Sequence, residues 1–282
     1  MTRGLGRHRS VVYTAMLTAI AVVVNFFRFT VPAGGAPALR ITFSGLFLHF
    51  ASVMFGAASG GAASGLADVI SHFLKPEGAY LPPLTATVTL RGVFTAFLWS
   101  KIKNADFNKF KNFYLLFIAL LGCLGVINAA VIKLFPGGAY LEFLRQIGAQ
   151  NESVNSNRLF ISSGRILVTA GLILISAAMF TAYAAIKVAG RKNKDAAPKS
   201  VSDYLKLIFA IGAPCLICTT VNTEILRVYF LLPDRAFIFL WIPRFIEEIV
   251  SVLINAYLLM VLVNVYKKNI RPDYAGIDPK HL

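Results

Sequence analysis

Long apolar runs, separated only by short polar stretches, most limit what this chain can fold into. No polar block of domain size occurs, and the longest polar tracts are 101–112, 146–158, 191–206 and 267–282. Charged residues make up 15% of the 282 residues, whereas soluble domains carry about a quarter. This pattern places the chain in the membrane class, because it has too few polar residues to cover a soluble fold.

Eight apolar runs are long enough, alone or as arms of a tight hairpin, to be membrane helices. They are 11–27, 41–55, 61–74, 84–100, 113–135, 159–188, 204–231 and 237–266. A cleaved signal peptide is the alternative for the first run, but the length of that run favours a retained helix. Pro82 and Pro83 predict the start of the fourth helix, because proline is favoured in a first turn. The predicted fold class is an all-α polytopic membrane protein.

Lysine and arginine are distributed unequally between alternate loops. With the N-terminus inside, the inner segments 1–10, 101–112, 187–206 and 267–282 hold 3, 4, 6 and 4 of them. The outer segments together hold five. Cytoplasmic loops carry the positive excess, so we predict eight spans with both termini in the cytoplasm. The net charge of +15 is then explained by topology and by contact with anionic lipid, and we expect no nucleic-acid partner.

Ionisable residues inside the apolar runs are candidates for function, because an unpaired charge in hydrocarbon is costly. Arg28, at the end of a run, is expected to snorkel towards water. Glu224 and Arg227 lie three apart and can pair on one helix. Lys133 also lies near the end of a run, and the remaining deep charges are Asp68, Arg91, Arg165, Arg244, Glu247 and Glu248. The residues alone leave open whether these form helix-pinning pairs or a ligand pocket, although the aspartate is expected to contact another helix.

Motifs for catalysis and metal binding are missing from the sequence. It contains no GxxxxGK[ST], no H-E-x-x-H and no G-x-S-x-G. Cys215 and Cys218 have the spacing of a redox or metal pair, but no second pair completes a site. We therefore predict no catalytic residue, no metal site and no bound cofactor. Energy for any transport is expected from an ion gradient or from another subunit.

Several short motifs follow one another in the first hundred residues. They are Arg40–Phe43 (RITF), Phe55–Ala57 (FGA), Gly65–Asp68 (GLAD) and Gly78–Pro82 (GAYLP). Near the other end lie VNTEIL (Val221–Leu226) and IPRFIEEIVSVLINAYLL (Ile242–Leu259). Together with AMLTAIAVVV (Ala15–Val24), they resemble the folate-type substrate-binding (S) component of energy-coupling factor (ECF) transporters. The resemblance covers residues 11–100 and 204–266.

This resemblance implies a six-helix S-component core with two additional transmembrane helices. Residues 1–103 would form the first four core helices, 104–200 the inserted pair, and 201–282 the last two core helices with a cytoplasmic tail. The chain would be the high-affinity vitamin-binding subunit of an ECF-type ABC importer in a bacterial cell membrane, for folate or a related anionic heteroaromatic vitamin. A transmembrane coupling subunit and two ATPase subunits would be its partners, which explains the missing P-loop. The role of the inserted helices, 113–188, stays open.

The resemblance also suggests where a vitamin binds. The predicted substrate-binding residues are Arg40, Phe43, Tyr80, Thr85, Asn222 and Arg244. The two arginines are expected to hold the anionic end of the ligand through forked hydrogen bonds. The two aromatic residues would form apolar walls, and the threonine and asparagine would read the edge of the ring. Ala15 and Ala19 form a small-residue face that is predicted to dock onto the coupling subunit.

Two other functions stay open on the residues alone. A stand-alone ion-coupled transporter would show an inverted repeat and broken helices at the membrane midplane, and no convincing repeat relates the two halves. An intramembrane enzyme would need a catalytic constellation around Glu247 or Glu248. The sequence does not decide whether Arg91 pairs with these acids or joins a pocket.

Overall fold

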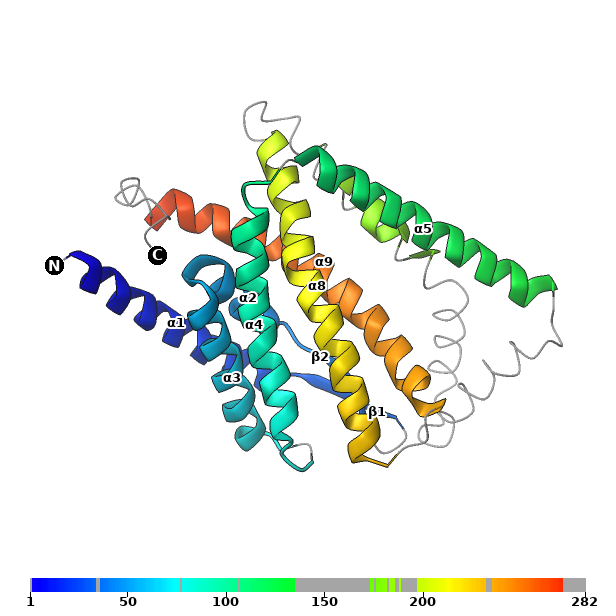
Figure 1. Cartoon of the computed structure of the whole chain (residues 1–282), viewed down its shortest axis with the longest axis horizontal. Coiled ribbons are helices and arrows are strands. Elements are labelled where there is room, and N and C mark those ends of the chain that lie inside the picture. Colours follow the sequence, from blue (N-terminus) through cyan, green and yellow to red (C-terminus); the bar gives the residue numbers. More distant parts are fainter. Residues whose placement is uncertain are drawn as a thin grey trace.

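The computed structural model describes residues 2–33, 36–76, 78–105, 107–134, 173–174, 176–181, 183–185, 188, 197–231 and 235–270. Its helices are α1 (Thr2–Phe26), α2 (Ser44–Phe55), α3 (Ala57–Leu74), α4 (Pro82–Ile102), α5 (Phe107–Leu134), α8 (Ala197–Tyr229) and α9 (Arg235–Ile270). Figure 1 shows α1 to α4 side by side with α8 and α9, while α5 lies on the outer side of α8. The fourth helix begins at its two prolines, as predicted.

A β-hairpin between α1 and α2 departs from the predicted all-α fold. Strands β1 (Phe29–Ala33) and β2 (Ala36–Ile41) pair antiparallel, with Thr30 opposite Arg40. The register shifts between Val31 and Pro32, where proline has no N–H for the ladder. The run predicted to be helical from residue 41 therefore starts as a helix only at Ser44. The hairpin escaped sequence analysis because its prolines and small residues are also typical of a loop.

Glycines set the path and the spacing of α2, α3 and α4. The chain turns from α2 into α3 at Gly56, whose φ of +88° lies in the region that favours glycine. Further along, α3 and α4 cross closely. A Cβ atom at Gly61 would lie 2.7 Å from Val93 Cγ2, and one at Gly92 would lie 2.6 Å from Ser64 Oγ. At Gly92 the Gly60 carbonyl oxygen would lie closer still, so only glycine fits there without a shift of the backbone, whereas at Gly61 the Val93 side chain would have to move.

Two helices in the described part of the chain are long and apolar enough to cross a membrane by length and composition. They are Ser202–Tyr229 and Arg244–Tyr266. Shorter apolar helices cover Ser10–Phe26, Ser44–Phe55 and Lys111–Ile127. The predicted run 159–188 lies largely outside the described residues, so the number of spans stays a prediction.

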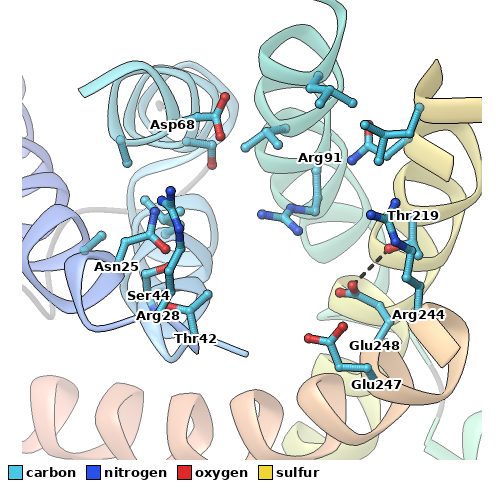
Figure 2. A pocket seen from close by; sticks show the side chains of 18 residues that line it. Asn25, Arg28, Thr42, Ser44, Asp68, Arg91, Thr219, Arg244, Glu247 and Glu248 are labelled. Atoms are coloured by element: carbon cyan, nitrogen blue, oxygen red, sulfur yellow. Dashed lines mark hydrogen bonds between the residues drawn. The ribbon is translucent and has the colours of Figure 1, made fainter. Parts of the chain in front are cut away.

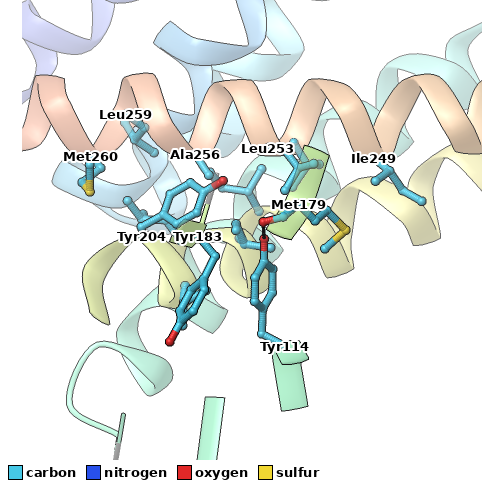
Figure 3. Close-up of a cluster of buried hydrophobic side chains, with 14 of the residues drawn as sticks. Tyr114, Met179, Tyr183, Tyr204, Ile249, Leu253, Ala256, Leu259 and Met260 are labelled. Atoms are coloured by element: carbon cyan, nitrogen blue, oxygen red, sulfur yellow. Dashed lines mark hydrogen bonds between the residues drawn. The ribbon is translucent and has the colours of Figure 1, made fainter. Parts of the chain in front are cut away.

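Aromatic and sulfur-containing side chains hold α5 against the bundle (Figure 3). Tyr114 of α5 and Tyr204 of α8 are each only 1% exposed. The Tyr114 hydroxyl donates to the carbonyl oxygen of Met179 at 3.1 Å, and the Tyr183 ring lies 6.1 Å from the Tyr114 ring. Leu253 of α9 belongs to the same buried cluster. These contacts attach α5 to Met179 and Tyr183, and the shared buried cluster extends to α8 and α9. The predicted assignment of 104–200 as an insertion stays a prediction.

We expect Gly92→Ala to lower the free energy of unfolding by about 1–3 kcal/mol, the usual effect of overpacking a tight contact. Gly45→Ala is the matched control, because a Cβ atom there would lie 3.5 Å from Asn255 Nδ2, an ordinary contact. Thermal unfolding in detergent, followed by circular dichroism, measures both variants. Equal midpoints for the two variants would contradict the tight crossing of α3 and α4.

Candidate functional site

A cavity of about 220 Å³ lies between α1, α2, α3, α4, α8 and α9, and each of these helices lines it. Its charged lining residues are three arginines and three carboxylates: Arg28, Arg91, Arg244, Asp68, Glu247 and Glu248. Amides and hydroxyls add to the polar wall, namely Asn25, Asn222, Thr42, Ser44, Ser64 and Thr219. Figure 2 shows the labelled side chains, among them Asp68, Arg91 and Glu248, around a common space. The cavity is thus a polar interior within an apolar bundle.

Two of the carboxylates are held by threonines of neighbouring helices. Thr85 Oγ1 donates to Asp68 Oδ2 at 2.6 Å, which joins α4 to α3. Thr219 Oγ1 donates to Glu248 Oε2 at 2.9 Å, which joins α8 to α9. Asp68 therefore makes the helix-to-helix contact that we predicted. Because a carboxylate can accept several hydrogen bonds, both groups keep acceptor capacity for a ligand.

Asn222 of α8 is oriented by α4. The Thr87 hydroxyl is hydrogen-bonded to its carboxamide oxygen. Cys218, one turn earlier on α8, donates its thiol to the Thr87 carbonyl oxygen at 3.3 Å. These bonds join α4 to α8 and leave the amide at the wall of the cavity with a fixed direction.

The arginines of the cavity differ in their surroundings. Arg28 is 8% exposed, and its Nη2 donates to the Lys75 carbonyl oxygen at 2.7 Å. The Lys75 ammonium in turn donates to the Arg28 carbonyl oxygen at 3.1 Å. This exchange ties the end of α1 to the end of α3, so the prediction that Arg28 snorkels to water is wrong.

Arg91, at the middle of α4, forms no hydrogen bond or ion pair with any residue that the structure describes. The acids that interact with it electrostatically are Glu248 and Asp68. The predicted pairing of Glu224 with Arg227 is present: Arg227 Nε donates to Glu224 Oε2 at 2.8 Å. That pair does not line the cavity.

Two of the predicted substrate-binding residues, Asn222 and Arg244, line the cavity, from α8 and α9. Thr85 lies behind the cavity wall and reaches it only through Asp68. Arg40 lies in β2, and its side chain is outside the described part of the chain. The cavity therefore brings together residues from both ends of the sequence.

The two predicted aromatic walls are not among the lining residues. Phe43 is 55% exposed, and Tyr80 is 37% exposed. The Tyr80 ring packs against the end of α3, with its centroid 5.1 Å from that of His72. Ala15 and Ala19, the predicted docking residues, are exposed on α1, whereas Thr18 of the same helix is buried and donates to a backbone carbonyl of its own helix.

Sequence reasoning missed several residues of the cavity. It recognised four of the lining residues as deep charges, namely Asp68, Arg91, Glu247 and Glu248, but assigned none of them to the site. Three polar lining residues near the end of α1 and the start of α2 were not assigned to the site either, namely Arg28, Thr42 and Ser44. Which faces of six helices share one space cannot be read from spacing along one run.

A family model described as "ECF-type riboflavin transporter, S component" matches residues 7–161, more than half of the 282 residues. The chain belongs to this family. No curated protein and no solved structure gives a significant match. As an S component, the protein is a multi-pass membrane subunit of a transporter and is not an enzyme. The predicted S-component family is confirmed, whereas the folate type stays a prediction.

The match covers this S component only in part. It includes α1 to α5 and crosses the predicted boundary at residue 103. Helices α8 and α9 lie beyond it, yet they supply Thr219, Asn222, Arg244, Glu247 and Glu248 to the cavity. The charged lining is therefore shared equally: Arg28, Asp68 and Arg91 lie inside the matched segment, and Arg244, Glu247 and Glu248 lie beyond it.

We expect Thr85→Val to lower the stability of this S component by about 1 kcal/mol, because Asp68 loses its hydroxyl donor. Thr89→Val is the matched control on the same helix, since the Thr89 hydroxyl donates only to the Thr85 carbonyl oxygen of its own helix, at 2.8 Å. Chemical unfolding in detergent measures both variants. If both lose the same stability, the Thr85–Asp68 bond contributes nothing specific to the site.

Proposed function

We propose that this S component binds a heteroaromatic vitamin in the cavity between α1 to α4, α8 and α9. One observation carries the proposal: six helices of an apolar chain converge on a space lined with arginines, carboxylates and amides. In a membrane protein, ionisable groups gathered around a cavity indicate a path or a binding site for a polar solute. Arg244 and Asn222 would contact the ligand directly.

Two vitamins are the candidates for this cavity. Folate is suggested because the motifs of the chain resemble the folate-type S component. Riboflavin is the vitamin in the name of the matched family. Both carry a flat fused ring with hydrogen-bonding edges, which fits a wall of fixed amide and carboxylate groups. The stand-alone ion-coupled transporter is disfavoured, because an S component works with other subunits.

Transport would require partners. In the proposed assembly, a transmembrane coupling subunit with two ATPase subunits hydrolyses ATP, and this chain contributes no P-loop. Eight spans with both termini in the cytoplasm would put the lysine-rich and arginine-rich segments inside. The exposed Ala15 and Ala19 on α1 support a docking face, because small residues let a partner helix approach closely.

The vitamin is tested by mass spectrometry of small molecules released from the purified protein, followed by titration with folate, riboflavin and thiamin. We expect saturable binding of folate or of riboflavin at one site per chain, and none of thiamin. Arg244→Ala should weaken binding of a carboxylate-bearing vitamin by about 2 kcal/mol, because a charge-assisted bond is lost. A purified, folded protein that retains no heteroaromatic vitamin and binds none of these three would contradict the proposal.

Docking is tested separately from binding. Ala15→Trp should leave vitamin affinity unchanged and abolish uptake in cells that also produce the coupling and ATPase subunits, because the bulky ring blocks helix approach. Ala119→Trp, an equally large change at an exposed position of α5, is the matched control and should leave uptake intact. Normal uptake by Ala15→Trp would reject the docking face.

A further inference from the structure

We propose that Arg91 is the principal anchor of the ligand, and that it recognises the edge of a pyrimidine-type ring, where carbonyl or ring-nitrogen acceptors alternate with N–H donors. This inference rests on the proposed function and deepens it, because it names the part of the vitamin that is read. Neither the family match nor the motifs of the sequence assign a role to Arg91.

The position of Arg91 is the first argument. Its side chain leaves the middle of α4 and points into the space between α3 and α9 (Figure 2). A guanidinium carries five N–H donors in a planar fork and no acceptor. None of these donors has a hydrogen-bond partner among the described residues. These donors are therefore available to acceptors that enter the cavity.

The acids around Arg91 give the second argument. Asp68 and Glu248 stand on opposite sides of it (Figure 2), and both interact with it electrostatically. Neither forms an ion pair with it in the described part of the chain. Asp68 instead accepts a hydrogen bond from Thr85 of α4, and Glu248 accepts one from Thr219 of α8. The cavity therefore presents a donor fork flanked by two acceptor groups. A matching ligand edge carries N–H donors next to carbonyl or ring-nitrogen acceptors.

The balance of charge gives the third argument. The lining holds as many arginines as carboxylates, so a free carboxylate entering it meets repulsion as well as attraction. A neutral ring edge is not repelled by the carboxylates. Its acceptors can bond to the arginines, and its N–H donors can bond to the carboxylates. Asn222, fixed by Thr87, adds a donor and an acceptor of the same kind. Pterin and isoalloxazine rings both carry such an edge, whereas the glutamate tail of folate does not.

Titration of the purified full-length protein with the vitamin that it retains tests the anchor. Arg91→Gln should raise Kd about 10- to 100-fold, the range expected when a charge-assisted hydrogen bond is lost. Arg91→Lys keeps the charge but loses the fork, and should also bind at least several-fold more weakly. Arg227→Gln is the matched control, because this arginine of α8 lies outside the lining, and its Kd should stay unchanged. Unchanged affinity in Arg91→Lys, or in a folded Arg91→Gln, would overturn the proposal.

Fragments of the two vitamins show which part is recognised. Lumichrome and 6-hydroxymethylpterin represent the rings, and p-aminobenzoylglutamate represents the tail. We expect the ring fragment of the retained vitamin to bind and the tail not to bind, with Arg91→Gln weakening the ring fragment by the same factor as the whole vitamin. Binding of the tail alone would refute ring recognition.

The outcomes separate this inference from the proposed function. If the wild-type protein retains a vitamin without a pyrimidine-type ring, the function stands and the inference fails. If it retains such a vitamin but Arg91→Gln binds it normally, the inference again fails alone. If the folded protein binds no vitamin, both are wrong.

Discussion

A charged side chain inside an apolar bundle must have a partner, and the cavity of this S component is organised around that requirement. Arginines and carboxylates would pair and close the space if they were free to move together. Thr85 and Thr219 donate hydrogen bonds to Asp68 and Glu248 from neighbouring helices, and neither acid forms an ion pair with Arg91 in the described part of the chain. Two neutral hydroxyls thus orient two of the carboxylates that line the cavity with Arg91.

These threonine–carboxylate hydrogen bonds can form only because the helices are close. Glycines at the crossing of α3 and α4 remove side chains where the backbones meet, which brings the Thr85 hydroxyl within 2.6 Å of Asp68. Close packing through small residues is a common way for helices to associate in membranes, where burial of apolar surface supplies little driving force. The same packing places Arg91, two turns further along α4, over the cavity.

The family match and the lining of the cavity give different information about this S component. The matched segment, 7–161, contains α1 to α5, while α8 and α9 bring two glutamates, an arginine and an asparagine to the cavity. The family thus identifies the role of the protein as a subunit of a transporter. The chemistry of the ligand depends on residues from both parts, and on Arg91 where they face each other.

The sequence by itself determined that this is a helical membrane protein, where most of its helices lie, and that it is an S component, because apolar run length and motif order are properties of the chain alone. It also predicted the Glu224–Arg227 pair and the contact of Asp68 with another helix. Only the tertiary structure decided that Arg28 is buried, that Phe43 and Tyr80 lie away from the cavity, and that Arg91 faces Asp68 and Glu248. These facts depend on how helices rotate and cross, and the rotation of one helix is fixed by side chains on others that are distant in sequence.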